Sequence, residues 1–156
     1  QHAIGASQRI MMNLRPAILD QGLIASVQWL VSRFEKRTGV KTRFHSSGGE
    51  PEVTKTVQLT AYRTAQEALT NISKYARCDL VTIDLTDTEG MLTLEITDNG
   101  QGISEADLAK VNSFGLKGLR ERAKTIGGWL DVSTRTGAGT SIILSIPLSP
   151  QLPLAG

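Results

Sequence analysis

The sequence QEALTNISK at residues 66–74 decides the fold, because it lies within the longest stretch of helical apolar periodicity in the chain. That periodicity predicts an amphipathic helix at 54–76. Glu67, Asn71 and Lys74 share one stripe of this helix, opposite the centre of its apolar side. A carboxylate, an amide oxygen and an ammonium so placed could hold a hydrated Mg²⁺ and a phosphate together. The alternative is a solvated face with a weak Glu67–Lys74 interaction.

Apolar patterns on either side of this helix predict the remaining elements. The expected order is helix, strand, helix, hairpin, helix and hairpin, which indicates an α+β fold. It is a two-layer α/β sandwich with a largely antiparallel, mixed sheet packed against about three helices. The expected helices are 20–38, 54–76 and 115–127, after a helix end at 4–14; the strands are 40–44, 81–85, 92–96, 129–135 and 140–147, with a loop at 99–114.

Length and composition exclude several classes of protein. The 156 residues fit one domain, and the single Cys78 rules out an internal disulfide or a Cys-rich zinc site. Residues 1–49 hold seven Lys/Arg and two acids, whereas the rest holds ten and thirteen. No basic run has interleaved aromatics, so direct nucleic-acid binding is not expected. No apolar run reaches the roughly 18–20 residues of a membrane span.

Asp98 continues the apolar face of the strand predicted at 92–96, because side chains alternate with a period of two. An aspartate on that face is costly to bury unless it meets hydrogen-bond donors, and the exocyclic amine of adenine is one such donor. The alternative is a plain turn, since Asp98-Asn99-Gly100 is a favourable hairpin sequence. The residues alone leave both interpretations open.

Two glycine motifs follow. GLKG at 115–118 opens a predicted helix after a loop, where free N–H groups and the positive helix end favour an anion. Ordinary capping explains one of these glycines and explains two less well. GAGT at 137–140 begins the last strand, and a plain hairpin with positive-φ glycines accounts for it. The common phosphate-loop and dinucleotide motifs are missing, and neither His2 nor His45 has partners that indicate a catalytic triad.

Taken in order, QEALTNISK (66–74), DNGQGI (98–103), GLKGLRERA (115–123) and GAGT (137–140) resemble four sequence boxes of one known family. They are similar to the N, G1, G2 and final Gly-Thr boxes of the catalytic domain of bacterial sensor histidine kinases. The GLKGLRER form resembles the nitrate/nitrite-sensor subgroup. NLRPAILDQGL at 13–23 resembles that subgroup's junction between dimerisation and catalytic domains.

The resemblance implies a Bergerat-type (GHKL) ATP-binding fold and an enzyme, a protein histidine kinase. It would transfer the γ-phosphoryl group of Mg-ATP to a histidine on a helical domain absent from this sequence, leaving ADP. A response-regulator aspartate would then receive the phosphoryl group. Phosphoryl transfer needs mainly positioning and charge neutralisation, which suits the residue types in these boxes.

The resemblance also implies roles for individual residues. Asn71 would coordinate Mg²⁺, Glu67 would hold a metal-bound water or assist the phosphoacceptor, and Lys74 would contact phosphate. Asp98 would bind the adenine amine, with Thr140 in the adjoining water network. The other implied nucleotide contacts line the lid loop and the phosphate turn: Tyr75, Gly100, Gly102, Ile103, Gly115, Leu116, Lys117, Gly118 and Leu119. Tyr75 stands where the subgroup commonly has His.

The same resemblance divides the chain into a remnant of the dimerisation helix at 1–16, a catalytic domain at 17–148 and a flexible tail at 149–156. It implies two partners: the protein's own dimerisation and phosphoacceptor domain, and a response regulator with a helix-turn-helix output domain. The parent protein would be a homodimer, whereas this chain alone is compatible with a monomer. The domain would be cytoplasmic, and anchorage of the parent in the inner membrane is left open.

Two rival functions share this nucleotide pocket. One is a serine kinase of the anti-sigma-factor type, against which the Leu14-Arg15-Pro16 junction argues. The other is a degenerate domain that binds nucleotide as a switch without catalysis, against which the intact Glu67 and Asn71 argue.

Overall fold

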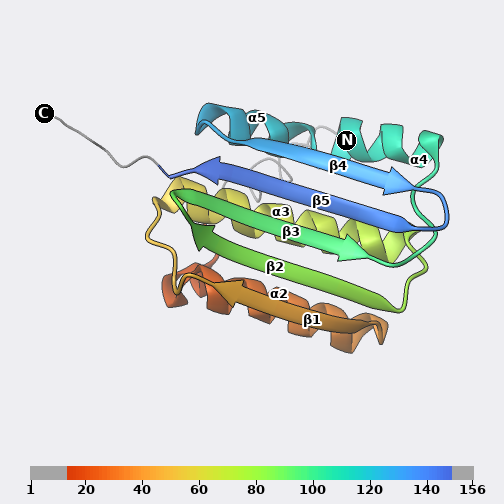
Figure 1. The fold of residues 1–156 in the computed structure, drawn as a ribbon, viewed down its shortest axis with the longest axis horizontal. Helices are drawn as coiled ribbons and strands as arrows, with labels where there is room; N and C mark the ends of the chain where they lie inside the picture. Colours follow the sequence, from red (N-terminus) through yellow and green to blue (C-terminus); the bar gives the residue numbers. More distant parts are fainter. Residues whose placement is uncertain (1–13, 149–156) are drawn as a thin grey trace, which may run out of the picture.

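The computed structural model describes residues 14–148, which form one mixed sheet of five strands in the order β1-β2-β3-β5-β4 (Figure 1). Strands β1 and β2 are parallel, and the other neighbouring pairs are antiparallel. The parallel pair follows from the helix that connects β1 to β2, because parallel strands need a long crossover. The strands are β1 (Lys41–Ser47), β2 (Leu80–Thr88), β3 (Met91–Asp98), β4 (Trp129–Arg135) and β5 (Gly139–Pro147).

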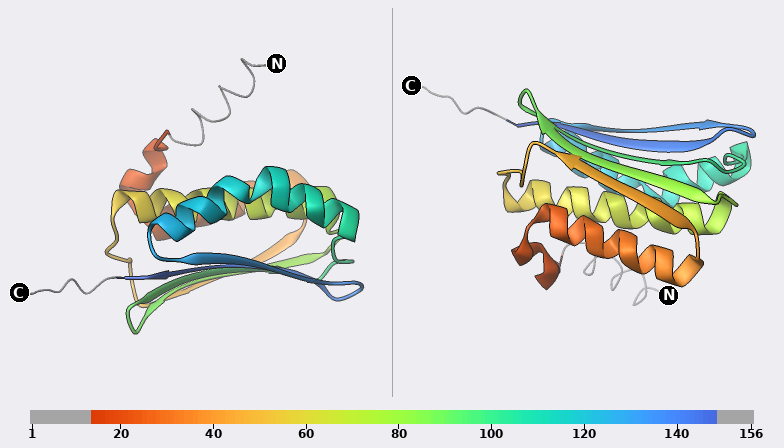
Figure 2. Two further views of the ribbon diagram at one scale, coloured as in Figure 1. Left: turned by 90° about the horizontal axis from the view of Figure 1, so that it is seen from above. Right: turned by 60° about the horizontal axis from the view of Figure 1, so that its bottom comes forward.

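The helices cover one face of the sheet and leave the other face open (Figure 2). Helices α2, α3 and α5 form most of this layer, and the shorter helical segments η1, α4 and η2 complete it. This arrangement confirms the predicted two-layer sandwich with a largely antiparallel, mixed sheet. The helices are η1 (Ala17–Gln21), α2 (Leu23–Thr38), α3 (Lys55–Tyr75), α4 (Glu105–Lys110), the π-helical η2 (Val111–Gly115) and α5 (Lys117–Thr125).

Strand alternation builds the core beneath the helices. One cross-strand row joins Leu85, Leu94, Leu144 and Leu130, all of them buried. The next inward-facing row has the same apolar character, so the helix-facing side of four strands is a continuous aliphatic surface. Buried alanines at 61, 65 and 68 let α3 approach that surface closely.

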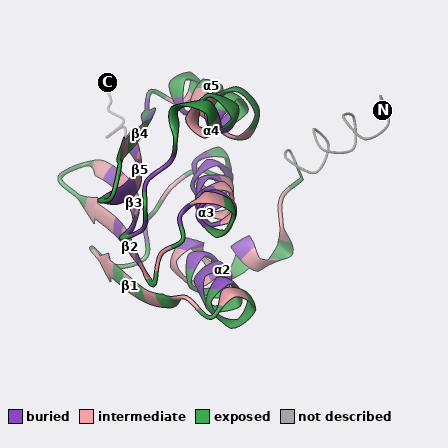
Figure 3. Ribbon diagram, turned by 90° about the vertical axis from the view of Figure 1, so that its right-hand side faces the viewer, coloured by how far each residue is buried: buried purple, intermediate pink, exposed green. Residues whose placement is uncertain are grey.

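Helix α3 lies at the centre of the helical layer, between α2 and the α4–α5 region (Figure 3). It is therefore buried on more sides than a typical amphipathic helix. Two of its threonines are fully buried, and their hydroxyls donate to carbonyls one turn back: Thr60 to Thr56 at 2.9 Å and Thr64 to Thr60 at 2.7 Å. These bonds satisfy polar groups that burial would otherwise penalise.

The predicted loop at 99–114 is wrong over its second half, because α4 and η2 make residues 105–115 helical. Ser104 caps α4 by accepting a hydrogen bond from the Asp107 N–H at 3.1 Å. Val111 is buried and Leu108 partly buried, so the segment has an apolar side of its own. The Ser-x-x-Asp spacing was the signal for this helix.

Smaller differences occur near the start of the domain. Helix α2 begins at Leu23 rather than near residue 20, because Gly22 adopts a φ of 102° that interrupts the helix after η1. Strand β1 extends to Ser47, beyond the predicted end at 44. The predicted helix end at 4–14 and the tail at 149–156 fall almost entirely on residues 1–13 and 149–156, which lie outside the described residues.

Truncation of Leu94 to alanine should destabilise the domain by about 2–5 kcal/mol, because the leucine is at the centre of the buried row and a cavity would remain. Urea denaturation followed by circular dichroism measures the loss. Thr93→Ala, on the open face of the same strand, is the control and should cost less than about 1 kcal/mol. Equal losses at the two positions would contradict the assigned faces of β3.

Candidate functional site

The carboxylate of Asp98 is buried at the end of β3, where the aspartate is 2% exposed. Its Oδ1 accepts a hydrogen bond from the Gly100 N–H at 2.8 Å, and the Thr140 backbone N–H also donates to the carboxylate. Burial raises the pKa of Asp98, and these two backbone bonds oppose the rise. The second oxygen, Oδ2, is buried without a partner. Asp98 thus makes the local turn and also presents a free acceptor.

A chain of hydroxyl groups lies beside this carboxylate. Thr140 is buried, and its Oγ1 lies 2.9 Å from the Oγ1 of Thr134. The Thr134 hydroxyl accepts a hydrogen bond from the Ile103 N–H at 2.8 Å. The structure therefore brings Asp98, Ile103 and Thr140 together. Thr134 was not predicted, although its pairing with Thr140 in the β4–β5 hairpin follows from the register.

Two glycines allow the backbone to close around Asp98. A Cβ on Gly139, whose φ is 92°, would overlap the Asp98 carbonyl oxygen. A Cβ on Gly100 would overlap the carbonyl oxygen of Ala76 at the end of α3. Gly102 lies beside the Arg135 carbonyl oxygen, so it packs against the β4–β5 hairpin. Glycine is required here by close backbone approach.

The loop after β3 is fastened to the C-terminal end of α3. The Gln101 N–H donates to the Ala76 carbonyl at 2.8 Å, and the Gln101 Nε2 donates to the Tyr75 carbonyl at 2.9 Å. The Tyr75 side chain is partly buried and packs against the core. Tyr75 and Gln101 therefore stand at the same end of the molecule as Asp98, and Gln101 is a second residue that sequence reasoning missed.

The polar stripe of α3 is buried in part. Asn71 is 4% exposed, and its Nδ2 is buried without a partner. Glu67 is half-buried against Gly115, where a Cβ would stand 2.5 Å from the Glu67 Oε2. Lys74 is exposed. The solvated-face interpretation is therefore wrong for Glu67 and Asn71, because α3 is the middle helix of its layer.

Desolvation dominates the electrostatics of Glu67. Burial raises the pKa of this carboxyl, and the positive charge of Lys74 opposes the rise. The folded state therefore holds the Glu67 proton more tightly than the unfolded chain does. Ionisation of Glu67 at neutral pH therefore lowers the free energy of unfolding, so this residue destabilises the fold.

The turn at residues 115–119 differs from the predicted helix start. The Leu116 N–H donates to the Val111 carbonyl at 2.8 Å, so it is not free, because the π-helical turn runs into α5. Leu116 and Leu119 are fully buried in the core. Lys117 is exposed, and a Cβ on Gly118 would meet no atom within 4 Å. Gly118 therefore has open space beside its backbone, whereas Gly115 is confined by Glu67.

The donor set suits one kind of metal. Among residues 14–148, no group of three or more His, Cys, Asp or Glu side chains is placed to hold an ion. An amide and a carboxylate one helical turn apart instead match Mg²⁺, which takes few protein oxygens and keeps waters and phosphate oxygens. The partnerless atom of Asn71 is its amide nitrogen Nδ2, a hydrogen-bond donor, so the magnesium ligand would be the Oδ1 of the same buried amide. Over the same described part of the chain, no helix has the length and apolarity to cross a bilayer.

Comparison with known proteins agrees with this geometry. The family described as histidine kinase-, DNA gyrase B-, and HSP90-like ATPase matches residues 56–150. The oxygen sensor histidine kinase NreB of Staphylococcus carnosus is 31% identical over 91% of this chain and 41% of its own length. The signal transduction histidine-protein kinase/phosphatase DegS of Brevibacillus brevis is 34% identical over 92% of this chain and 37% of its own length.

The chain thus spans about two fifths of the length of these curated relatives. Among solved structures, the histidine kinase domain from the Erythrobacter litoralis EL346 blue-light activated histidine kinase has a TM-score of 0.66 and 24% identity. The likeness covers 83% of this chain and 63% of that one. At this identity the structural likeness shows the shared fold.

Replacement of Glu67 by glutamine should raise the melting temperature at pH 7, because it removes a buried charge whose pKa is raised. The gain should shrink as the pH falls toward 4, because the wild-type carboxyl becomes mostly protonated in both the folded and the unfolded state. Melting curves at both pH values test this, with Glu121→Gln on the exposed side of α5 as the control. A gain of the same size at both pH values would contradict the role of desolvation.

Proposed function

The chain belongs to the family of histidine kinase-, DNA gyrase B- and HSP90-like ATPases, and we propose that it is the ATP-binding catalytic domain of a sensor histidine kinase. The observation that carries the proposal is the buried Asp98 carboxylate with one partnerless oxygen, at the edge of a glycine loop. The likeness to NreB and DegS, both histidine kinases, supports it.

Asp98 recognises adenine by its hydrogen-bonding polarity. The free Oδ2 accepts from the exocyclic amine of the base, and the Thr134 and Thr140 hydroxyls with bound water serve the neighbouring ring positions. Guanine has a carbonyl oxygen where adenine has that amine. Two acceptors would then face each other in a buried site, which penalises the wrong base strongly.

Asn71 and Glu67 would hold Mg²⁺, which when bound neutralises charge on the phosphoryl oxygens. Lys74 reaches phosphate from the exposed end of the same stripe, and the open backbone at Gly118 gives a phosphate room to approach. Tyr75, Gly102, Ile103 and the exposed part of the turn at 115–119, which is Lys117 and Gly118, complete the proposed nucleotide contacts. These groups would position the triphosphate and neutralise its charge, which are the main requirements of phosphoryl transfer.

The phosphoryl acceptor in this proposal is a histidine outside the sequence. His45 does not serve the site, because it is exposed on the open face of the sheet, 3.6 Å from Asp84. Several properties of the parent protein stay predictions. These are a homodimeric state, relay to a response regulator with a helix-turn-helix output domain, membership of the nitrate/nitrite-sensor subgroup, and placement in the cytoplasm with or without a membrane anchor.

Replacement of Asn71 by aspartate in the parent protein should abolish histidine phosphorylation. The variant places a second carboxylate where the proposal needs a neutral amide, one turn from Glu67 and beside the triphosphate. The measurement is label transfer from [γ-³²P]ATP, followed by acid treatment that removes phosphohistidine and spares phosphoserine.

The matched control is Ser73→Asp, which adds the same charge at an exposed position of α3 and should retain wild-type labelling. Acid-stable label on a partner protein would favour the serine kinase. Normal signalling by a parent that carries Asn71→Asp would favour the non-catalytic switch.

A further inference from the structure

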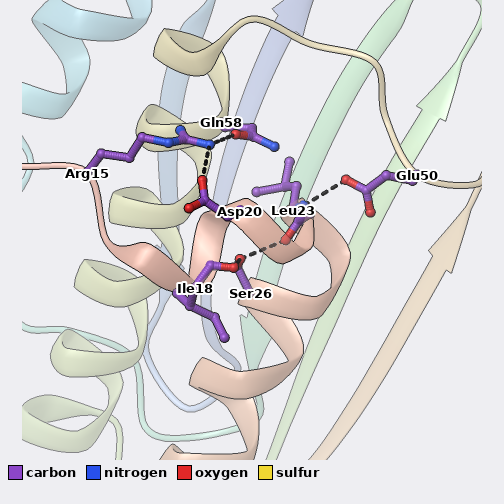
Figure 4. Close-up of polar contacts among 8 residues, drawn as sticks. Arg15, Ile18, Asp20, Leu23, Ser26, Glu50 and Gln58 are labelled. Carbon is purple, nitrogen blue, oxygen red and sulfur yellow. Dashed lines mark hydrogen bonds and ion pairs between the residues drawn. The ribbon is translucent and has the colours of Figure 1, made fainter.

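Residues 14–23 lead into α2 and are held against the domain by hydrogen bonds and an ion pair (Figure 4). Arg15 is 26% exposed, and its Nη2 donates to the Gln58 Oε1 on α3 at 2.6 Å. The same nitrogen lies 3.7 Å from the Asp20 Oδ1. The Arg15 guanidinium therefore links the chain at residue 15 both to the central helix α3 and to η1, the turn that contains Asp20.

A second arginine holds the chain one residue earlier. The Arg63 Nη2, on α3, donates to the Leu14 carbonyl at 3.0 Å, and its Nη1 donates to the Gln66 Oε1 at 2.7 Å. Arg63 is one helical turn before Glu67 on α3. The backbone at Leu14 is thus tied to the helix that carries the proposed phosphate and metal ligands.

The rest of the segment is fixed to α2. Leu19 is fully buried, and the Ser26 hydroxyl donates to the Ile18 carbonyl at 3.0 Å. Glu50 accepts from the N–H groups of Leu23 at 2.7 Å and Ile24 at 3.3 Å, which supplies the helix cap that Gly22 lacks. Residues 15–23 are therefore held against α2 and α3 by hydrogen bonds and by the buried Leu19.

Apolar burial does not account for the two arginine contacts. Leu14 is 58% exposed, so little apolar burial is gained where Arg63 holds its carbonyl. Two guanidiniums, each anchored on α3, instead restrict the direction in which the chain leaves the domain. Planar guanidinium groups with several donors suit such a directional contact.

We propose that Arg15 and Arg63 are positioning residues that set the direction of the chain preceding Leu14 relative to α3. The inference rests on the proposed function, since the phosphoacceptor would then be carried by that preceding chain. Transfer requires reacting atoms about 3–3.5 Å apart, and a misplacement of about 1 Å costs on the order of a hundredfold in rate.

The test uses the parent protein with Arg15→Ala, Gln58→Ala and the double variant. The histidine phosphorylation rate at saturating ATP should fall on the order of tenfold or more in Arg15→Ala, while the KM for ATP and the affinity for ADP stay at wild-type values. The double variant should be no slower than Arg15→Ala, because both changes remove the same contact. Arg15→Lys should restore part of the rate, and Arg43→Ala, an exposed arginine on β1, should leave it unchanged.

Wild-type rates in Arg15→Ala and Gln58→Ala would overturn the inference. A fall in rate that is matched by loss of ADP affinity or of melting temperature would overturn it as well, because the contact would then be merely structural. Failure of the proposed function would give a different result, because the unaltered parent would then bind no ADP or form no acid-labile label.

Discussion

The buried carboxylate of Asp98 is the constraint on which the site depends. A carboxylate at 2% exposure with one partnerless oxygen is costly, and the surrounding chain is organised to hold it there. Gly139 lets β5 approach its backbone, Gly100 supplies an N–H and permits contact with α3, and Thr140 donates a backbone bond. Gly100 and Gly139 are therefore geometric consequences of one buried acceptor, and that acceptor is what can select adenine.

Helix α3 connects this acceptor to the remaining chemistry. Its small residues let it lie flat on the sheet, its C-terminal end receives the loop after Asp98, and its middle carries Glu67 and Asn71. Its first turns hold the incoming chain through Gln58 and Arg63. The burial of Glu67 and Asn71 lowers the stability of the fold, and the proposed metal-binding role would account for it, since a purely structural helix would place apolar residues there.

Periodicity predicted the elements that bury an apolar face of their own. The helix expected at 54–76 is found at Lys55–Tyr75, and the alternation of β2 and β3 fixed which side chains face inward. The short α4 and η2 were not predicted, because two helical turns show little apolar periodicity, although the spacing of Ser104 and Asp107 indicated a helix cap. Burial of Asn71 could not be predicted from the local pattern, since it depends on the neighbouring helices. The Arg15–Gln58 bond spans 43 positions and follows from no local pattern.

The most direct test of the account is the melting temperature of this chain with ADP or GDP, in the presence and absence of Mg²⁺. Ligand at about a hundred times its dissociation constant adds roughly 2.7 kcal/mol, or several degrees for a domain of this size. We expect a Mg²⁺-dependent shift with ADP, a much smaller one with GDP, and loss of the shift in Asp98→Asn but not in Asp131→Asn on the exposed edge of β4. A folded wild-type chain that shows no shift, or an equal shift in Asp98→Asn, would contradict the central role of the buried carboxylate.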